Sequence, residues 1–190
     1  MDELNLDTLL KSIQSSDDNE RANARDRAGV VGAAAIAPLA KLAVEAENLE
    51  VARAANRAIQ NIVYHAGRPG ASAEAKAVTA ELIALLGTKH AQFRRDVLWM
   101  IWQIGGEEAA DPVARLLDDA ETGDDARMCL ERLPGARATE ILRARLAAAP
   151  EAQRPAVAHS LRVRGAEVVG YPSQKLTPTK KTTVKPVGRE

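Results

Sequence analysis

The chain has 190 residues, the length of one domain that can bury a core of its own. Although 46% of the residues are apolar, only 3% are aromatic, so the apolar residues are mainly Ala, Leu, Val and Ile, which favours closely packed helices. Lys plus Arg and Asp plus Glu each number 26, so the whole chain has no net field with which to attract phosphate or anionic lipid.

The charge is unevenly distributed along the chain. From Tyr171 onward there are five basic residues against Glu190 alone, so this segment carries +4 and residues 1–170 carry −4. The first residues are acidic where a secretory signal would be basic, and no apolar run approaches the roughly 18 residues that a spanning helix needs. We therefore expect a soluble, cytoplasmic protein without a membrane partner.

Apolar periodicity and turn residues predict an all-α protein with no strand. Asp17 or Ser16 can cap the second helix, Ser72 and Thr88 precede two further helices, and Thr122 begins a pattern like a capping box. The predicted helices, in chain order, span 3–14, 18–30, 34–46, 48–65, 72–86, 89–104, 107–119, 123–133, 136–148 and 150–164.

Glycines recur at regular intervals between these helices. Their spacings are 35, 38, 30 and 30 residues, which suits a repeat of two short helices, and we expect each glycine to take the left-handed conformation that ends a helix. The glycines are Gly32, Gly67, Gly105, Gly135 and Gly165.

The repeat divides the chain into three predicted parts. Residues 1–16 form an N-terminal capping helix, 17–165 a repeat domain of about four or five helix pairs, and 166–190 an extended tail rich in Thr, Pro and Lys. Stacking is expected because each pair carries an apolar stripe that it cannot bury alone. The stripe of the sixth predicted helix is Phe93, Val97, Met100, Ile101 and Ile104.

One unit of this pattern carries a family resemblance. A helix that begins with arginines ends at Ile104, Gly105 and Gly106, and the acidic turn Asp118-Asp119 follows a second helix. That second helix has the pattern Ala109, Pro112, Val113, Leu116, Leu117. The stretch from about 18 to 165 resembles HEAT repeats, in particular the short bacterial kind also known as phycobilisome-lyase HEAT-like repeats.

The resemblance implies a right-handed α-α superhelix, a HEAT-like, armadillo-like solenoid whose second helices line a concave surface. It implies little about function, because partner scaffolds, chromophore lyases and some DNA repair enzymes share this architecture.

No set of residues suited to catalysis is apparent. His65, His90 and His159 are far apart with no metal-ligand spacing, and Cys129 lies in an apolar run typical of a buried thiol. Phosphate-binding glycine motifs and a nucleophile elbow are also missing. We predict no catalytic residue, no metal and no cofactor.

Trp99 and Trp102 lie on the side of their helix away from its apolar stripe, beside Arg95. One interpretation is that the rings pack on adjoining helices. The other is that two rings and a guanidinium form a binding patch for a protein or a stacking platform for bases.

Further candidate contacts are Arg115, Arg137 and Arg143 on second helices, where charges of both signs favour a protein partner over nucleic acid. The tail is either solvated or a basic arm that docks on an acidic partner, RNA or the body of the chain. Its candidate contacts are Lys175, Lys180 and Lys181.

The leading hypothesis is a non-catalytic protein–protein interaction scaffold. The alternative is a nucleic-acid-binding protein resembling the HEAT-like DNA glycosylases, which the negative charge of residues 1–170 disfavours. A chromophore lyase is a third hypothesis and depends on the family name alone.

Overall fold

The computed structural model describes residues 4–172, and over that range the chain is helical with no strand. The predicted all-α class is therefore confirmed. The α-helices are α1 (Leu6–Ile13), α2 (Asp18–Arg27), α3 (Ile36–Glu45), α4 (Leu49–Ala66), α5 (Ser72–Ala84), α6 (Ala91–Ile104), α7 (Ala110–Ala114), α8 (Gly123–Arg132), α9 (Arg137–Ala148) and α10 (Arg154–Val163). Short 3-10 helices cover Ala28–Val30, Gly32–Ala35, Leu85–Gly87, Glu107–Ala109 and Glu151–Gln153.

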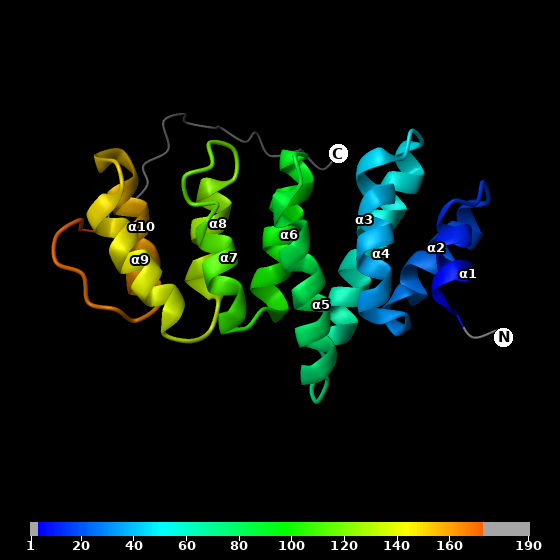
Figure 1. The fold of residues 1–190 in the computed structure, drawn as a ribbon, viewed down its shortest axis with the longest axis horizontal. Coiled ribbons are helices and arrows are strands. Elements are labelled where there is room, and N and C mark those ends of the chain that lie inside the picture. The colour runs from blue at the N-terminus through cyan, green and yellow to red at the C-terminus, as the bar shows by residue number, and fades with distance from the viewer. Residues whose placement is uncertain (1–3, 173–190) are drawn as a thin grey trace, which may run out of the picture.

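The helices follow one another along the longest axis of the molecule (Figure 1). Helices α2, α4, α6, α8 and α10 contact each other in that order, and we call them the first layer. The second layer consists of α3, α5, α7 and α9, in which α3 contacts α5 and α7 contacts α9. Helix α1 packs on α2.

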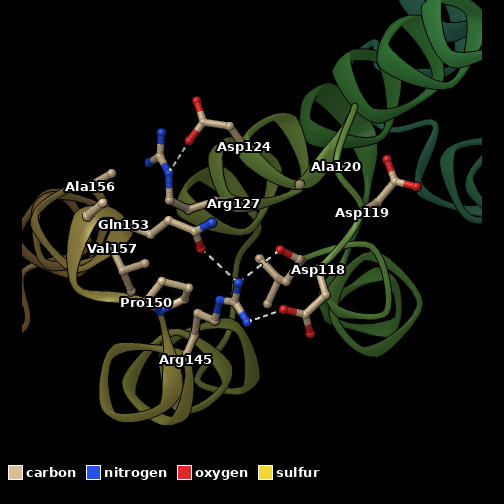
Figure 2. Close-up of a pocket in the computed structure, with 13 residues that line it drawn as sticks. Asp118, Asp119, Ala120, Asp124, Arg127, Arg145, Pro150, Gln153, Ala156 and Val157 are labelled. Carbon is tan, nitrogen blue, oxygen red and sulfur yellow. Dashed lines mark hydrogen bonds and ion pairs between the residues drawn. The ribbon is translucent and has the colours of Figure 1, made fainter.

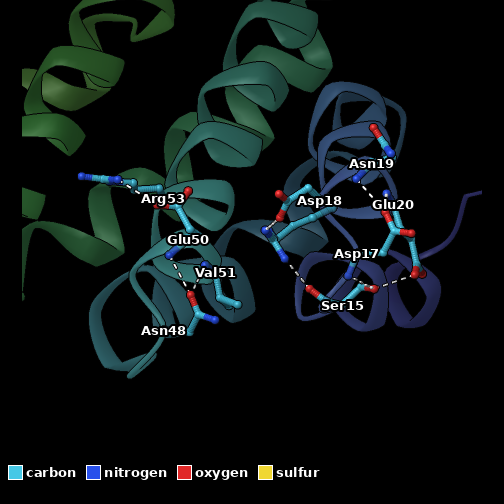
Figure 3. Close-up of polar contacts among 10 residues, drawn as sticks. Ser15, Asp17, Asp18, Asn19, Glu20, Asn48, Glu50, Val51 and Arg53 are labelled. Carbon is cyan, nitrogen blue, oxygen red and sulfur yellow. Dashed lines mark hydrogen bonds and ion pairs between the residues drawn. The ribbon is translucent and has the colours of Figure 1, made fainter.

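Polar caps fix where two first-layer helices begin (Figure 3). The Asp17 carboxylate accepts hydrogen bonds from the amides of Asn19 and Glu20, so the predicted cap is confirmed. Asn48 caps α4 in the same way. Hydrogen bonds from the hydroxyls of Ser15 and then Ser12 lower the pKa of Glu20 and tie α1 to α2.

Three other predicted caps are wrong. Ser72 is already inside α5, and His90 rather than Thr88 caps α6, because its Nδ1 accepts a hydrogen bond from the Phe93 amide. Thr122 precedes α8, but its hydroxyl donates to Asp119 and accepts from Arg94 instead of capping the helix. The Thr122 hydroxyl accepts a hydrogen bond from Arg94, which is distant in sequence, in place of one from a backbone amide of α8.

The turn glycines play two roles rather than the single predicted one. Gly32, Gly135 and Gly165 have positive φ values of 73°, 85° and 77°, as expected for the residue that ends a helix. Gly67 and Gly105 do not. At Gly105 the need is space, since a Cβ there would lie 2.6 Å from the carbonyl oxygen of Ile101.

The predicted helix over 107–119 is the least accurate of the ten. Only Ala110–Ala114 is α-helical, a 3-10 turn precedes it, and turns occupy the residues that follow. The apolar periodicity still placed the buried side correctly, because Val113 is fully buried and Leu116 and Leu117 pack against the core.

One continuous apolar core extends from Leu9 in α1 to Leu161 in α10. The predicted stripe of α6 belongs to it: Val97, Met100 and Ile101 are fully buried. Stacked neighbours bury these side chains where a single helix pair could not.

After α10 the chain turns back along the end of the molecule formed by α9 and α10 (Figure 1). Ala166 and Val168 pack against the core, and Arg162 donates a hydrogen bond of 2.6 Å to the Gly170 carbonyl. The described part of the predicted tail therefore covers the last helix pair. Lys175, Lys180 and Lys181 lie outside the described residues.

Candidate protein-binding surface

Three aromatic side chains and one arginine form a row across α4, α6 and α8. The Tyr64 and Trp99 rings meet edge to face with centroids 6.5 Å apart, and the Trp99 and Trp102 centroids are 6.3 Å apart. The Arg132 guanidinium lies over the Trp102 ring, 4.5 Å from its centroid, a cation–π distance. We call these four residues the aromatic row.

The two tryptophans differ in how far their rings are buried. Trp102 is half-buried and packs against the core, whereas Trp99 is 38% exposed and Tyr64 is 47% exposed. The rings thus bridge neighbouring helices of the first layer and still present apolar surface to solvent.

Arg95, the arginine predicted beside the tryptophans, stands four residues before Trp99 on α6 and is engaged with residues at the start of α8. Its Nη2 donates to the Glu121 carbonyl at 2.7 Å and its Nε lies 3.4 Å from Asp125. Arg132 on α8, the next helix of the first layer, lies over the Trp102 ring.

The repeat itself held the signal that would have found Tyr64 and Arg132. Tyr64, Trp102 and Arg132 each stand three residues before a turn glycine, at Gly67, Gly105 and Gly135. Equivalent positions of successive repeats lie side by side in a stacked array, so this common register predicts one row.

Other first-layer arginines join neighbouring helices and are not free to bind a partner. Arg94 contacts both Asp119 carboxylate oxygens at 3.1 Å and donates to Thr122 and to the Thr88 carbonyl. Arg164 donates to the carbonyls of Leu130 and Gly135 at 2.8 and 2.7 Å, and its burial lowers its pKa.

The second-layer candidates differ among themselves in their contacts. Arg137 is bound to Asp111 at 2.8 Å and to Glu140 at 3.1 Å, and these hydrogen bonds raise its pKa. Arg115 and Arg143 are exposed and have no ion pair within residues 4–172. Of the predicted site residues within 4–172, Trp99 and Trp102 contact each other, and Arg95 and Arg137 are engaged with carboxylates of the chain.

A hollow of about 530 Å³ lies between the α7–α8 turn and the start of α10 (Figure 2). Its charged side chains are already paired: Arg127 with Asp124 at 2.8 Å and Arg145 with Asp118 at 2.5 Å. Arg145 also bonds to Gln153. The contacts of Arg145 join α9 to the α7–α8 turn and to the 3-10 turn Glu151–Gln153, whereas the pair of Arg127 and Asp124 lies within α8. The paired groups leave neither a free base nor a nucleophile in the hollow.

The side chains most suited to catalysis or metal binding are either buried or not grouped together. Cys129 is fully buried, and this burial raises the pKa of its thiol to about 12. Within residues 4–172, no three His, Cys, Asp or Glu side chains are grouped to hold a metal ion. The same part of the chain contains no helix long and apolar enough to cross a membrane.

No known family model and no curated protein matches this sequence. Among solved structures, the chain is similar to an engineered protein determined by the Northeast Structural Genomics Consortium. The two share 20% identity over 83% of this chain and 78% of that chain, with a TM-score of 0.43. At that level the similarity supports no statement about fold or function.

Proposed function

We propose that this protein is a non-catalytic scaffold that binds another protein through the aromatic row. The observation that carries the proposal is the row itself, where exposed rings and a stacked guanidinium meet on adjacent helices. Clustered Trp, Tyr and Arg are the residue types that dominate binding energy at protein interfaces. The scaffold is a HEAT-like, right-handed α-α superhelix of about five unequal helix pairs, and it acts in the cytoplasm without a cofactor.

The net charge of −4 over residues 1–170 and the contacts of the two arginines nearest Trp99 favour a protein partner over nucleic acid. Binding of a phosphate backbone is favoured by a surplus of positive charge, which residues 1–170 do not have. Arg94 and Arg95, the arginines nearest Trp99 in sequence, are bound to carboxylates and to the carbonyls of Thr88 and Glu121. Asp96 lies on the same helix and accepts hydrogen bonds from Asn56 and Gln92.

Capture from an extract of the source cells, followed by mass spectrometry, tests the proposal. The immobilised wild-type chain is compared with the double variant Tyr64→Ala/Trp99→Ala and with the control Arg115→Ala/Arg143→Ala, which changes exposed residues of the second layer. We expect one specific protein to bind wild type and control and to be lost from the aromatic variant. Each variant is first shown by circular dichroism to be folded.

The captured protein is then purified, and its affinity for the three chains is measured directly. Equal affinity for wild type and the aromatic variant would show that the row is not the interface. Loss of affinity in the control alone would move the interface to the second layer.

A further inference from the structure

Arginines around the aromatic row have donors that nothing in the described chain uses. Arg132 is exposed and makes no hydrogen bond or ion pair within residues 4–172, although its face is stacked on Trp102. A guanidinium held by its face keeps its edge N–H groups available for a carboxylate. Arg132 is therefore positioned by the ring but has no anionic partner.

Two more first-layer arginines share this property. Arg27 at the end of α2 is exposed and has no hydrogen-bond or ion-pair partner within the described residues. Arg57 donates only to the neutral amide of Gln60, at 2.7 Å. Arg57 stands seven residues before Tyr64, two helical turns away on the same face of α4.

Nine of the seventeen arginines in residues 4–172, Arg21 among them, contact a carboxylate of the chain. The others of this set are Arg25, Arg53, Arg68, Arg94, Arg95, Arg127, Arg137 and Arg145. Of the arginines without a carboxylate, Arg154, Arg162 and Arg164 donate to carbonyls, and Arg115 and Arg143 belong to the second layer. Arg27, Arg57 and Arg132 remain, on the first-layer helices α2, α4 and α8.

A hollow next to Tyr64 extends the row toward α2. It measures about 410 Å³ and lies between the ends of α2 and α4. Val30, which is 64% exposed, and Tyr64 give it apolar surface, and the polar residues that line it are Asp26, Arg27, Asn61 and His65. Gly29 keeps the hollow's floor close to α4, since a Cβ there would lie 2.7 Å from the His65 Cβ.

We propose that the aromatic row binds an acidic peptide segment of the partner, with carboxylates on Arg27, Arg57 and Arg132 and an apolar side chain in the hollow beside Tyr64. This inference rests on the proposed function and names the chemistry of its partner. The charge complementarity is specific, because each guanidinium can take one carboxylate through paired hydrogen bonds.

The dimensions of the surface define the peptide. From α2 to α8 there are three helix-to-helix steps, and at about 9 Å for each the row spans roughly 27 Å. An extended chain advances about 3.3 Å per residue, so about eight or nine residues cover it. The chain's own segment 173–190 is an unsuitable occupant on grounds of charge, since its lysines have the same sign as Arg27, Arg57 and Arg132.

The two tryptophans of the chain both belong to the row, so their fluorescence reports on this surface and no other. The probe is a synthetic nine-residue peptide of alternating Glu and Leu with one Phe, titrated into the full chain. The comparison probes are the same peptide with Gln for every Glu, the same with Lys for every Glu, and single-stranded thymidine nonamer. We expect the acidic peptide alone to change the emission, and the change to weaken as salt rises.

Matched variants test which arginines bind the acidic peptide. Arg132→Gln is expected to weaken binding of the acidic peptide by about tenfold or more. The control Arg115→Gln removes an equally exposed second-layer arginine and is expected to leave the affinity unchanged. Arg57→Gln leaves Trp102 and its surroundings unchanged, so a loss of peptide affinity in this variant cannot result from a disturbed Trp102 ring.

Three results would overturn the inference: no response to the acidic peptide, an equal response to the Gln peptide, or an equal loss in Arg115→Gln. A stronger response to the thymidine nonamer would assign the surface to nucleic acid instead. If the acidic peptide fails while a captured protein still depends on Tyr64 and Trp99, the scaffold proposal stands and only the partner's chemistry is wrong.

Discussion

The two halves of the described chain, α1–α5 and α6–α10, join neighbouring helices by different polar contacts. In the first half, Asn61 donates to the Arg25 carbonyl at 2.9 Å, the Glu20 carboxylate accepts from Ser12 and Ser15, and Arg68 pairs with Glu74 at 2.6 Å. In the second half, the Arg94 guanidinium contacts the Asp119 carboxylate and the Arg164 guanidinium contacts the Leu130 carbonyl. Both halves bury aliphatic side chains, so the difference lies in the polar contacts alone.

This difference has a physical consequence. An amide contact to a carbonyl does not depend on ionisation, whereas a guanidinium–carboxylate contact is lost when the carboxylate is protonated and is weakened by salt. Acid should therefore weaken the contact of Arg94 with Asp119 and leave the contact of Asn61 with the Arg25 carbonyl unchanged, while the apolar core should contribute similarly to both halves.

The largest effect is expected from the core. Ile62→Ala removes a side chain of α4 that is 1% exposed, and should lower the free energy of unfolding by about 3 kcal/mol through lost burial and a residual cavity. Urea denaturation followed by circular dichroism measures it at low and high salt. Leu130→Ala in α8 is the matched change in the other half and should give a similar loss, and a loss confined to one half would contradict a shared core.

A smaller effect is expected from Arg164→Ala. It leaves the carbonyls of Leu130 and Gly135 without their donor and should cost about 2 kcal/mol in the same urea assay. Arg162→Ala, which loses one contact to the Gly170 carbonyl, is the control and should cost less than half as much. If the two variants were equally destabilised, Arg164 would not have the bracing role assigned to it.

The dependence of folding stability on pH distinguishes the contacts of the two halves most selectively. Hydrogen bonds from the Thr122 hydroxyl and amide lower the pKa of Asp119, with a further contribution from Arg94. The folded state thus favours the carboxylate, so its stabilisation is complete above about pH 4 and is lost as the pH falls through the lowered pKa.

The melting temperatures of wild type and Asp119→Asn should accordingly differ at pH 6 and converge as the pH is lowered below about 4. Asn61→Ala, in the first half, removes a contact to a carbonyl and should show a constant difference over the same range. A constant difference for Asp119→Asn as well would mean that its ionisation does not stabilise the fold.

The smallest effect is expected at the surface of the first half. Arg53→Ala breaks an ion pair with Glu50 in which both side chains are more than half exposed, and should cost less than about 0.5 kcal/mol. Arg94→Ala, whose side chain is 11% exposed, should cost clearly more in urea denaturation. Equal costs would remove the distinction between bracing arginines and surface arginines.

The fold was predictable from sequence to the extent that it depends on local signals. The apolar periodicity of α6 and the cap at Asp17 gave the correct helices, because both act within a few residues. The Thr122 cap failed since its hydroxyl is used by Arg94, which stands 28 residues earlier and could not be paired with it by spacing. The short α7 failed for a related reason: periodicity identifies the buried side but not whether the backbone between turns is α-helical.

The candidate site was half predictable. The tryptophans stood out because they lie off the stripe of their own helix, and that argument needs one helix only. Tyr64 and Arg132 come from neighbouring helices, so they required an alignment of the repeats on their turn glycines. Whether an arginine is free or engaged depends on partners 20 to 30 residues away, as for Arg94 with Asp119, and single-helix patterns contain no such information.

The central claim is that a partner covers the aromatic row, and acrylamide quenching of tryptophan emission tests it most directly. Both tryptophans belong to the row, and Trp99 is 38% exposed in the free chain. The account predicts efficient quenching in the free chain and a clear reduction when the captured protein is bound at saturation. Quenching that is unchanged in the bound state would contradict it.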